Sequence, residues 1–196
     1  MLLIDLSFEH SYQVREPEQS DVSGEESSLF FGPSKKEAVE RIVVVPKTGR
    51  AWTAEFSVDY DVPPAVSGVY ATPDPDKVCV VVGGCGYMIS ALQPSEYQRI
   101  SCFPIVAVAQ ATKASRIVFA DFTNLAAWDR SQETWRSDRA SVDGIEFLNF
   151  NGSTLFARGW EDDGSTLQPF EFRVDLVSGS LSGVSEQTIN YGKQRN

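Results

Sequence analysis

Short runs of β-branched and aromatic residues alternate with turn-forming residues along almost the whole chain, and this pattern restricts the fold more than any other feature. The runs occupy residues 2–6, 41–45, 51–58, 68–72, 78–82, 87–90, 105–109, 117–120, 145–149, 154–159, 170–176 and 180–183. Turn-type residues separate them at Lys47-Thr48-Gly49, Asp74-Pro75-Asp76, Gly83-Gly84, Asn151-Gly152, Asp163-Gly164 and Ser178-Gly179. Because glycine and asparagine tolerate the positive φ angles of tight hairpins, the pattern predicts an all-β fold built as an antiparallel hairpin meander.

The hydrophobic patterns within the runs predict how the strands are oriented. Apolar residues fall on every second position of residues 170–176, which indicates one buried side and one wet side. Residues 78–82 are apolar throughout, which is typical of a central strand covered on both faces. Helix signals are few: the sequence predicts only short helical turns near Ser34 and Pro94.

A weak internal period groups the runs. Segments that begin near Leu29, Gly68, Ile105 and Ile145 each hold three apolar runs, and their starts are 39, 37 and 40 residues apart. A period near forty is typical of blade-type repeats, so the meander is predicted to be propeller-like. A β-sandwich or an open barrel gives comparable strand spacing, and both stay open as alternatives.

The charge is acidic and unevenly distributed. The chain has 27 acidic and 17 basic residues, a net charge of −10, which argues against nucleic acid as a partner and suits a basic protein. Residues 1–28 hold seven acids and one arginine, so they carry −6 of this charge. We therefore predict an acidic N-terminal segment over residues 1–28, a strand plus a partly flexible loop, followed by a single all-β domain over residues 29–196.

The start of the chain and its cysteines bear on location and on metal binding. No basic segment precedes the first apolar residues, and no window approaches the ~20 apolar residues of a membrane helix, so we expect a cytoplasmic protein with no membrane partner. Cys79, Cys85 and Cys102 form no Cys-x-x-Cys pair. A disulfide framework and a metal site are therefore not expected.

Catalytic and cofactor signals are weak. His10 is the sole histidine, so a nucleophile that relies on a histidine base is not expected. The glycines at residues 83–86 resemble a phosphate-binding loop, but the residues that follow are β-like, so they are interpreted as a hairpin turn and no cofactor is expected. Carboxylate pairs meet in space rather than in sequence, so an acid pair for hydrolysis stays open, with Asp121, Asp129, Asp143 and Glu161 as candidates.

The richest local stretch for binding lies between residues 128 and 143. Tryptophan and arginine dominate binding hot spots, through large contact area and bidentate hydrogen bonds. The candidate binding residues are therefore Trp128, Trp135, Arg136, Arg139 and Asp143. The alternative is that Trp135 packs as an ordinary core aromatic while the arginines pair with nearby acids.

Three groups of residues in the second half of the chain carry a resemblance. They are Trp135-Arg136-Ser137-x-Arg139-x-Ser141-x-Asp143-Gly144-Ile145, Gly159-Trp160, and Pro169-Phe170-x-Phe172-x-Val174-Asp175-Leu176-x-Ser178-Gly179. Over about a third of its length the chain thus resembles a group of uncharacterised bacterial all-β proteins. The resemblance implies a bacterial source and a shared β fold, and it implies no activity.

Together these features favour a non-catalytic binding or interaction module over an enzyme. One specific form is an immunity-type or antitoxin-like inhibitor of a basic effector protein, because opposite charge speeds the encounter of such partners. A carboxylate-type hydrolase that acts on a sugar-like ligand stays open as an alternative. A structural assembly subunit is the third possibility, and the sequence leaves the oligomeric state undetermined.

Overall fold

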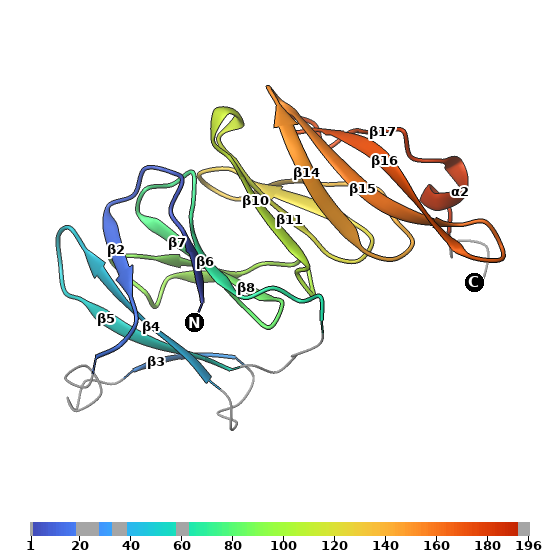
Figure 1. The fold of residues 1–196 in the computed structure, drawn as a ribbon. Coiled ribbons are helices and arrows are strands. Elements are labelled where there is room, and N and C mark those ends of the chain that lie inside the picture. The colour runs from blue at the N-terminus through green and yellow to red at the C-terminus, as the bar shows by residue number, and fades with distance from the viewer. Residues whose placement is uncertain (1, 19–27, 33–38, 58–62, 192–196) are drawn as a thin grey trace. The chain divides into compact units, whose positions relative to one another are not determined.

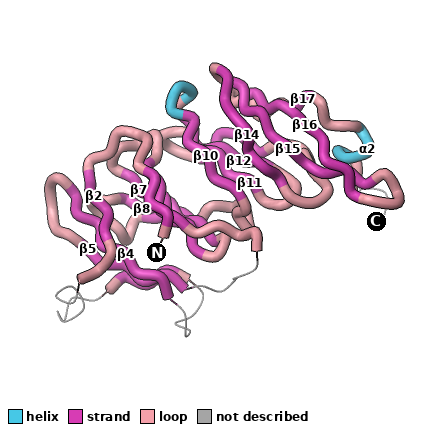
Figure 2. The backbone as a smooth tube through the Cα atoms, in the orientation of Figure 1, coloured by secondary structure: helices cyan, strands magenta, loops and turns pink. Residues whose placement is uncertain are grey.

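The computed structural model describes residues 2–18, 28–32, 39–57 and 63–191. Strands make up most of these residues, and helix is limited to two single turns (Figure 2). The predicted all-β fold of antiparallel hairpins is confirmed. Of the two predicted helical turns, the one near Ser34 lies outside the described residues. The one near Pro94 is a tight turn, closed by a hydrogen bond from the Glu96 amide to the Gln93 carbonyl (2.8 Å), after which a strand begins at Tyr97.

The chain divides into two compact units, residues 1–101 and residues 102–196. This division differs from the one expected from the sequence, which placed a boundary at residue 28. The reason lies in the N-terminal strands. Strand β1 (Leu3–Asp5) pairs with β6 (Gly68–Ala71), and β2 (Tyr12–Arg15) pairs with β4 (Val39–Pro46), so both belong to the sheets of the first unit (Figure 1).

The described part of the first unit contains two sheets. The five-stranded sheet has the order β1-β6-β7-β8-β9, with β7 (Lys77–Val82), β8 (Cys85–Ser90) and β9 (Tyr97–Arg99). The four-stranded sheet has the order β2-β4-β5-β3, with β5 (Trp52–Ser57) and β3 (Leu29–Phe31). The β1·β6 and β3·β5 pairs are parallel, and the other pairs are antiparallel.

A shared core holds these two sheets together. Val78, Val80 and Val82 alternate along β7 and pack in one cluster with Ile42 of β4 and Phe56 of β5. Burial of each such aliphatic side chain contributes about 1.5–3 kcal/mol. The other residues of β7, apart from Lys77 at its start, are buried as well, so β7 is covered on both faces, as its apolar sequence predicted.

The described part of the second unit also contains two sheets, and both are simple antiparallel meanders. The first consists of β10 (Ala107–Ala111), β11 (Arg116–Ala120), β12 (Leu125–Trp128) and β13 (Glu133–Arg136), with the 3-10 turn η1 (Thr112–Ala114) between β10 and β11. The second consists of β14 (Ile145–Asn151), β15 (Thr154–Asp162), β16 (Leu167–Asp175) and β17 (Leu181–Ser182). The single helical turn α2 (Glu186–Ile189) follows. Inward-facing residues of both sheets form one core, which includes Leu125, Leu155 and Phe172.

Four hairpins of the second unit are closed by the same device, in which an aspartate Oδ1 accepts hydrogen bonds from the backbone amides two and three residues further on. The four residues are Asp121, Asp129, Asp163 and Asp175. A serine or threonine hydroxyl within the turn donates to the same oxygen in each case. Aspartate favours such turns because its short side chain can bond its own backbone. The device fixes the loop length and therefore the register of each hairpin.

The weak period of about forty residues corresponds to the sheets. Each of the four predicted segments supplies most of one sheet, and β1 and β2 add to the sheets of the first unit. Within each unit two sheets share one core, which is the packing of a β-sandwich. The propeller-like arrangement of all four segments stays a prediction. No helix in the described ranges is long and apolar enough to cross a membrane.

Candidate binding face

The two predicted binding tryptophans lie on opposite faces of one sheet. Trp135 of β13 is paired with Ala127 of β12, which belongs to the core, so the Trp135 ring also packs against the core. Its Nε1 donates a hydrogen bond to the Leu176 carbonyl oxygen (2.9 Å). Trp128 follows Ala127 and therefore points the other way, where it is 7% exposed and its Nε1 has no acceptor within the described part of the chain.

The remaining predicted residues are also dispersed. Arg136 is exposed and its Nε lies 3.4 Å from a carboxylate oxygen of Glu133. The Arg139 guanidinium lies over the Tyr191 ring, 5.7 Å from its centre. Asp143 is exposed in the loop before β14. The structure does not bring the two tryptophans together, and the binding role of these residues stays a prediction.

The groups considered for catalysis are engaged elsewhere or buried. The His10 Nδ1 lies 2.9 Å from the Phe8 carbonyl oxygen, to which it donates when it carries the proton. All three cysteines are buried thiols. Burial raises the pKa of the Cys79 and Cys102 thiols, which keeps them protonated and unreactive. Among the described residues, no group of three or more His, Cys, Asp or Glu side chains is placed to hold a metal ion.

A different surface gathers binding-type side chains: the outward face of the β14–β17 sheet. We call it the β15 face and define it by six residues: Glu146, Phe156, Arg158, Trp160, Glu171 and Arg173. Leu155, Ala157 and Gly159 of β15 are buried, so the residues between them point outward. Phe156 and Trp160 are half-buried and lie outside the core cluster.

An ion-pair ladder crosses the β15 face. Arg158 lies directly opposite Glu146 of β14 and Glu171 of β16. Its guanidinium reaches a carboxylate oxygen of Glu146 at 3.1 Å and one of Glu171 at 3.6 Å. Exposed ion pairs of this kind stabilise a fold by at most about 1 kcal/mol. Their main consequence is that Arg158 is held between two acids.

Trp160 is fixed at one end of the β15 face by its neighbours. The Ser141 hydroxyl accepts a hydrogen bond from the Trp160 amide (2.8 Å) and donates to the Trp160 carbonyl oxygen (3.2 Å). The Trp160 ring lies beside Gly144, where an added Cβ would come within 3.6 Å of it. Pro169 of β16 lies directly opposite on the neighbouring strand. The indole is therefore held on a rigid backbone with part of its surface exposed.

A groove opens at the other end of the β15 face. Its volume is about 350 Å³, and its lining is formed by Phe156, Glu171, Phe172, Arg173, Ser182 and Gly183. Arg173 lies directly opposite Phe156, and its guanidinium carbon is 5.3 Å from the centre of that ring. No carboxylate of the described residues lies within ion-pair distance of Arg173. The groove thus contains a cation that is stacked but not neutralised.

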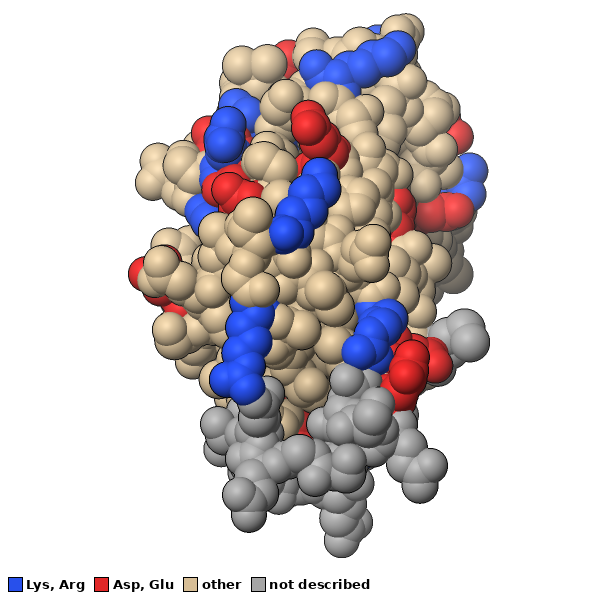
Figure 3. Space-filling view, turned by 90° about the vertical axis from the view of Figure 1, so that its left-hand side faces the viewer, with Lys and Arg blue, Asp and Glu red and all other residues tan. Residues whose placement is uncertain are grey.

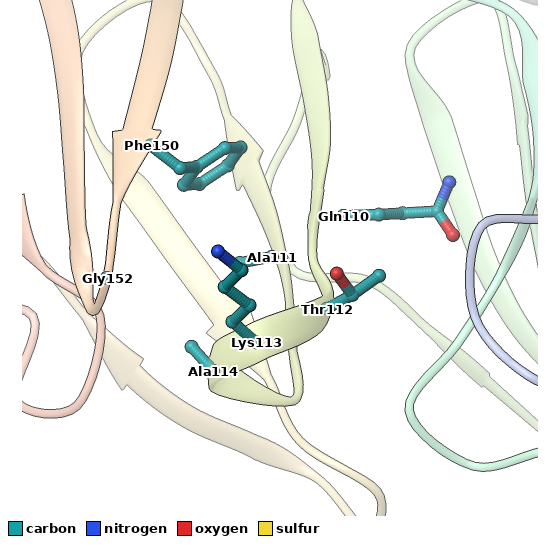
Figure 4. A pocket seen from close by; sticks show the side chains of 7 residues that line it. All are labelled: Gln110, Ala111, Thr112, Lys113, Ala114, Phe150 and Gly152. Atoms are coloured by element: carbon teal, nitrogen blue, oxygen red, sulfur yellow. The ribbon is translucent and has the colours of Figure 1, made fainter.

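Two other concave sites are less suited to binding. In the first unit, a groove of about 260 Å³ is lined by Leu2 and Ile4, but its arginines are engaged: Arg41 pairs with Glu55 at 2.9 Å, and Arg15 donates to the Glu16 carbonyl oxygen. The pocket beside η1 has a volume of only about 160 Å³, and the Gln110 side chain points away from Phe150 there (Figure 4). Pockets that hold organic ligands are usually about 300–1,000 Å³.

On the face that Figure 3 displays, charge alone does not mark a site. The described basic and acidic side chains are interspersed there and do not gather into one patch of a single sign. A binding surface must therefore be identified from local geometry. The alternation in residues 154–160 was the sequence signal for the β15 face, because it places small or aliphatic residues inward and Phe156, Arg158 and Trp160 outward.

No protein-family model matches the chain. No curated protein and no solved structure matches it either.

Proposed function

We propose that the chain is a non-catalytic protein-binding module whose partner docks on the β15 face. The supporting observation is the pair of part-exposed aromatic side chains, Phe156 and Trp160, on the wet side of an antiparallel sheet. Such a side normally carries polar residues, so aromatic rings there point to contact with another molecule. Trp and Arg are the residue types that dominate protein interfaces, and the β15 face offers both.

A protein fits this surface better than a small molecule. The aromatic and charged side chains extend over three strands and do not converge on one enclosed cavity. The four-stranded sheet holds them in fixed positions, so little side-chain entropy is lost when a partner binds. Basic side chains of a partner would meet Glu146 and Glu171 there, whose side chains are 53% and 69% exposed.

The net charge of −10 favours a basic protein as this partner, and an inhibitor of the immunity or antitoxin type is the specific form we propose. The cytoplasm is the location we propose for it. The inhibitor role and the location are supported by the sequence, and identification of the partner would test them.

The test uses the full chain as bait in a lysate of the cells that encode it, followed by purification of the captured protein and calorimetry. We expect Trp160→Ala and Phe156→Ala each to weaken binding at least ~10-fold, since truncation of a central aromatic usually costs more than about 1.4 kcal/mol. Leu3→Ala is the matched control, because Leu3 is an exposed apolar residue (60% exposed) of the first unit. Affinities within twofold of the wild type for both aromatic variants would refute the proposal.

A further inference from the structure

We infer that the groove beside Arg173 is a subsite for a carboxylate side chain, an aspartate or glutamate of the protein partner. This inference rests on the proposed function, since it specifies what one end of the β15 face recognises. It depends on four features: a guanidinium with no carboxylate partner among the described residues, a ring beneath it, a hydroxyl beside it and a groove with room for a ligand.

The first feature is the difference between the two arginines of the β15 face. Arg158 has a carboxylate on each side, at 3.1 and 3.6 Å, so its charge is already satisfied. Arg173 has none among the described residues, although it lies on the adjacent strand of the same face. An arginine fork is complementary to a carboxylate and can bind it through two parallel N–H···O bonds. Arg173 therefore offers an unused carboxylate-binding group.

The second feature is that Arg173 is pre-positioned. Its guanidinium carbon lies 5.3 Å from the centre of the Phe156 ring, within the range of a cation–π contact. Stacking restricts the long side chain before a ligand arrives, so less entropy is lost on binding.

The third and fourth features shape the space beside Arg173. Ser182 of β17 lies directly opposite Arg173, so its hydroxyl can donate an O–H···O hydrogen bond to the carboxylate that Arg173 binds. Gly183 follows with a φ of +88°, and an added Cβ there would lie 3.2 Å from the Glu171 carbonyl oxygen. The groove that Gly183 lines has a volume of about 350 Å³, more than enough for one acidic side chain.

The neighbouring Glu171 sets the selectivity. Glu171 lines the groove, and its carboxylate is paired with Arg158 at 3.6 Å, so it does not neutralise Arg173. It does repel a second negative charge placed on its side of the groove. We therefore expect the subsite to prefer a single carboxylate over a dianionic group of phosphate type.

The test is nuclear magnetic resonance of the ¹⁵N-labelled full chain, titrated with acetylated and amidated peptides Ala-Ala-X-Ala-Ala, where X is Glu, Gln or Lys. We expect the Glu peptide to shift the Arg173 Nε–H and Ser182 amide signals with a dissociation constant of about 1–10 mM, the range of a single charged contact. The Gln and Lys peptides should leave these signals unchanged. Inorganic phosphate is a further arm and should bind more weakly than the Glu peptide.

Three variants complete the experiment. Arg173→Gln should abolish the response, and Arg173→Lys should weaken it about 3–10-fold, because lysine keeps the charge but loses the planar fork. Arg41→Gln is the matched control: Arg41 also faces outward from a sheet, but its guanidinium is already paired with the Glu55 carboxylate. Equal binding of the Glu and Gln peptides, an undiminished response in Arg173→Gln, or tighter binding of phosphate than of the Glu peptide would each overturn the inference.

Failure of this inference can be told apart from failure of the proposed function. If Trp160→Ala abolishes partner binding while the Glu peptide produces no shift, the β15 face stands and the carboxylate subsite is wrong. If the Glu peptide binds at Arg173 but the partner tolerates Trp160→Ala and Phe156→Ala, the subsite stands and the proposed docking of the partner is wrong.

Discussion

Gly179 shows how one residue can be required by both the backbone and a neighbour. It lies in the β16–β17 turn with a φ of +75°, a conformation that residues with a side chain rarely adopt. An added Cβ would also lie 2.7 Å from the Trp135 ring. That ring cannot move aside easily, because its Nε1 is bonded to the Leu176 carbonyl oxygen.

Gly179→Ala should therefore lower the free energy of unfolding by about 2–5 kcal/mol, the combined effect of a strained φ and an overpacked contact. Gly152→Ala is the control, since Gly152 also has a positive φ (+61°) but has no atom within 4 Å of the added Cβ. It should cost about 1–2 kcal/mol. Urea unfolding of the two variants measures both values, and equal losses would show that the Trp135 ring plays no part.

The aspartate turns make the stability of the fold depend on pH, through the ionisation of single aspartate side chains. The amide of Thr166, the hydroxyl of Ser165 and the amide of Ser165 lower the pKa of Asp163 to about 2. In the unfolded chain an aspartate has a pKa of about 3.9. A lowered pKa in the folded state stabilises the fold above the unfolded value, and this contribution is lost as the pH falls from about 4 to about 2.

We expect wild type to be more stable than Asp163→Asn at pH 7, because asparagine keeps an acceptor oxygen in the turn but lacks the charge. The difference in melting temperature should shrink steadily between pH 4 and pH 2. Thermal unfolding at four or five pH values checks this. A difference that is constant over that range would mean that the Asp163 charge does not contribute.

The sequence could not predict on which face the two tryptophans lie. Trp128 and Trp135 flank a hairpin turn, and the pairing of β12 with β13 shifts in register between Ala127 and Trp128. Each extra or missing residue in a turn or bulge exchanges the two faces of the following strand. The closeness of Trp128 and Trp135 in the sequence therefore did not indicate a shared surface. In β15 the alternation is uninterrupted, and it did indicate which side chains share a face.

At the scale of elements, four of the five strands that lie outside the predicted runs are edge strands, and the fifth, β12, lies inside its sheet. β2, β3, β9 and β13 each lie at the border of a sheet. The three residues of β9 are all exposed, so this strand shows neither an apolar run nor an alternation. Central strands such as β7 are recognisable because burial on both sides demands apolar residues. The turns were also recognisable: five of the six predicted turn sites lie between consecutive strands, and the sixth, Asn151-Gly152, begins at the last residue of β14.

β16 continues beyond the end of its edge partner. β17 pairs only with Arg173 and Val174, and the Asp175 amide donates to the Ser180 carbonyl oxygen (3.0 Å). Backbone N–H and C=O groups alternate in direction along a strand. Residues 173, 171 and 169 of β16 therefore point these groups toward the same edge, the one on the β17 side. Pro169 has no N–H to offer there, which protects the edge against pairing with another chain.

Pro169→Val should therefore promote self-association, because it restores an amide on an exposed edge in a strand-forming residue. Light scattering or sedimentation over a range of protein concentrations measures this, and we expect a concentration-dependent rise in mass. Gln168→Val adds the same side chain, but its amide faces β15, so it should stay like the wild type. Identical behaviour of both variants would mean that added hydrophobicity, and not the edge amide, is responsible.

At the scale of the whole molecule, the buried thiols report on global unfolding. Cys79 and Cys102 are 0% and 1% exposed and Cys85 is 5% exposed, so no thiol is accessible while the core is intact. We expect the native protein to react slowly with an aromatic disulfide reagent at pH 8, and all three thiols to react at once in denaturant. Rapid reaction of one thiol under native conditions would indicate local opening near that residue.

The second unit and the first differ in how far apart in sequence their paired strands lie. Every strand pair of the second unit joins neighbours along the chain, whereas β1 pairs with β6 sixty-five positions away. Local pairings form faster than distant ones, because less chain entropy is lost before the first contact. In pulsed hydrogen exchange during refolding, we expect the amides of residues 102–191 to become protected before those of β1 and β6. During synthesis the order of appearance is the reverse: β1 leaves the ribosome first, yet it must wait without a partner until residues 68–71 have followed it.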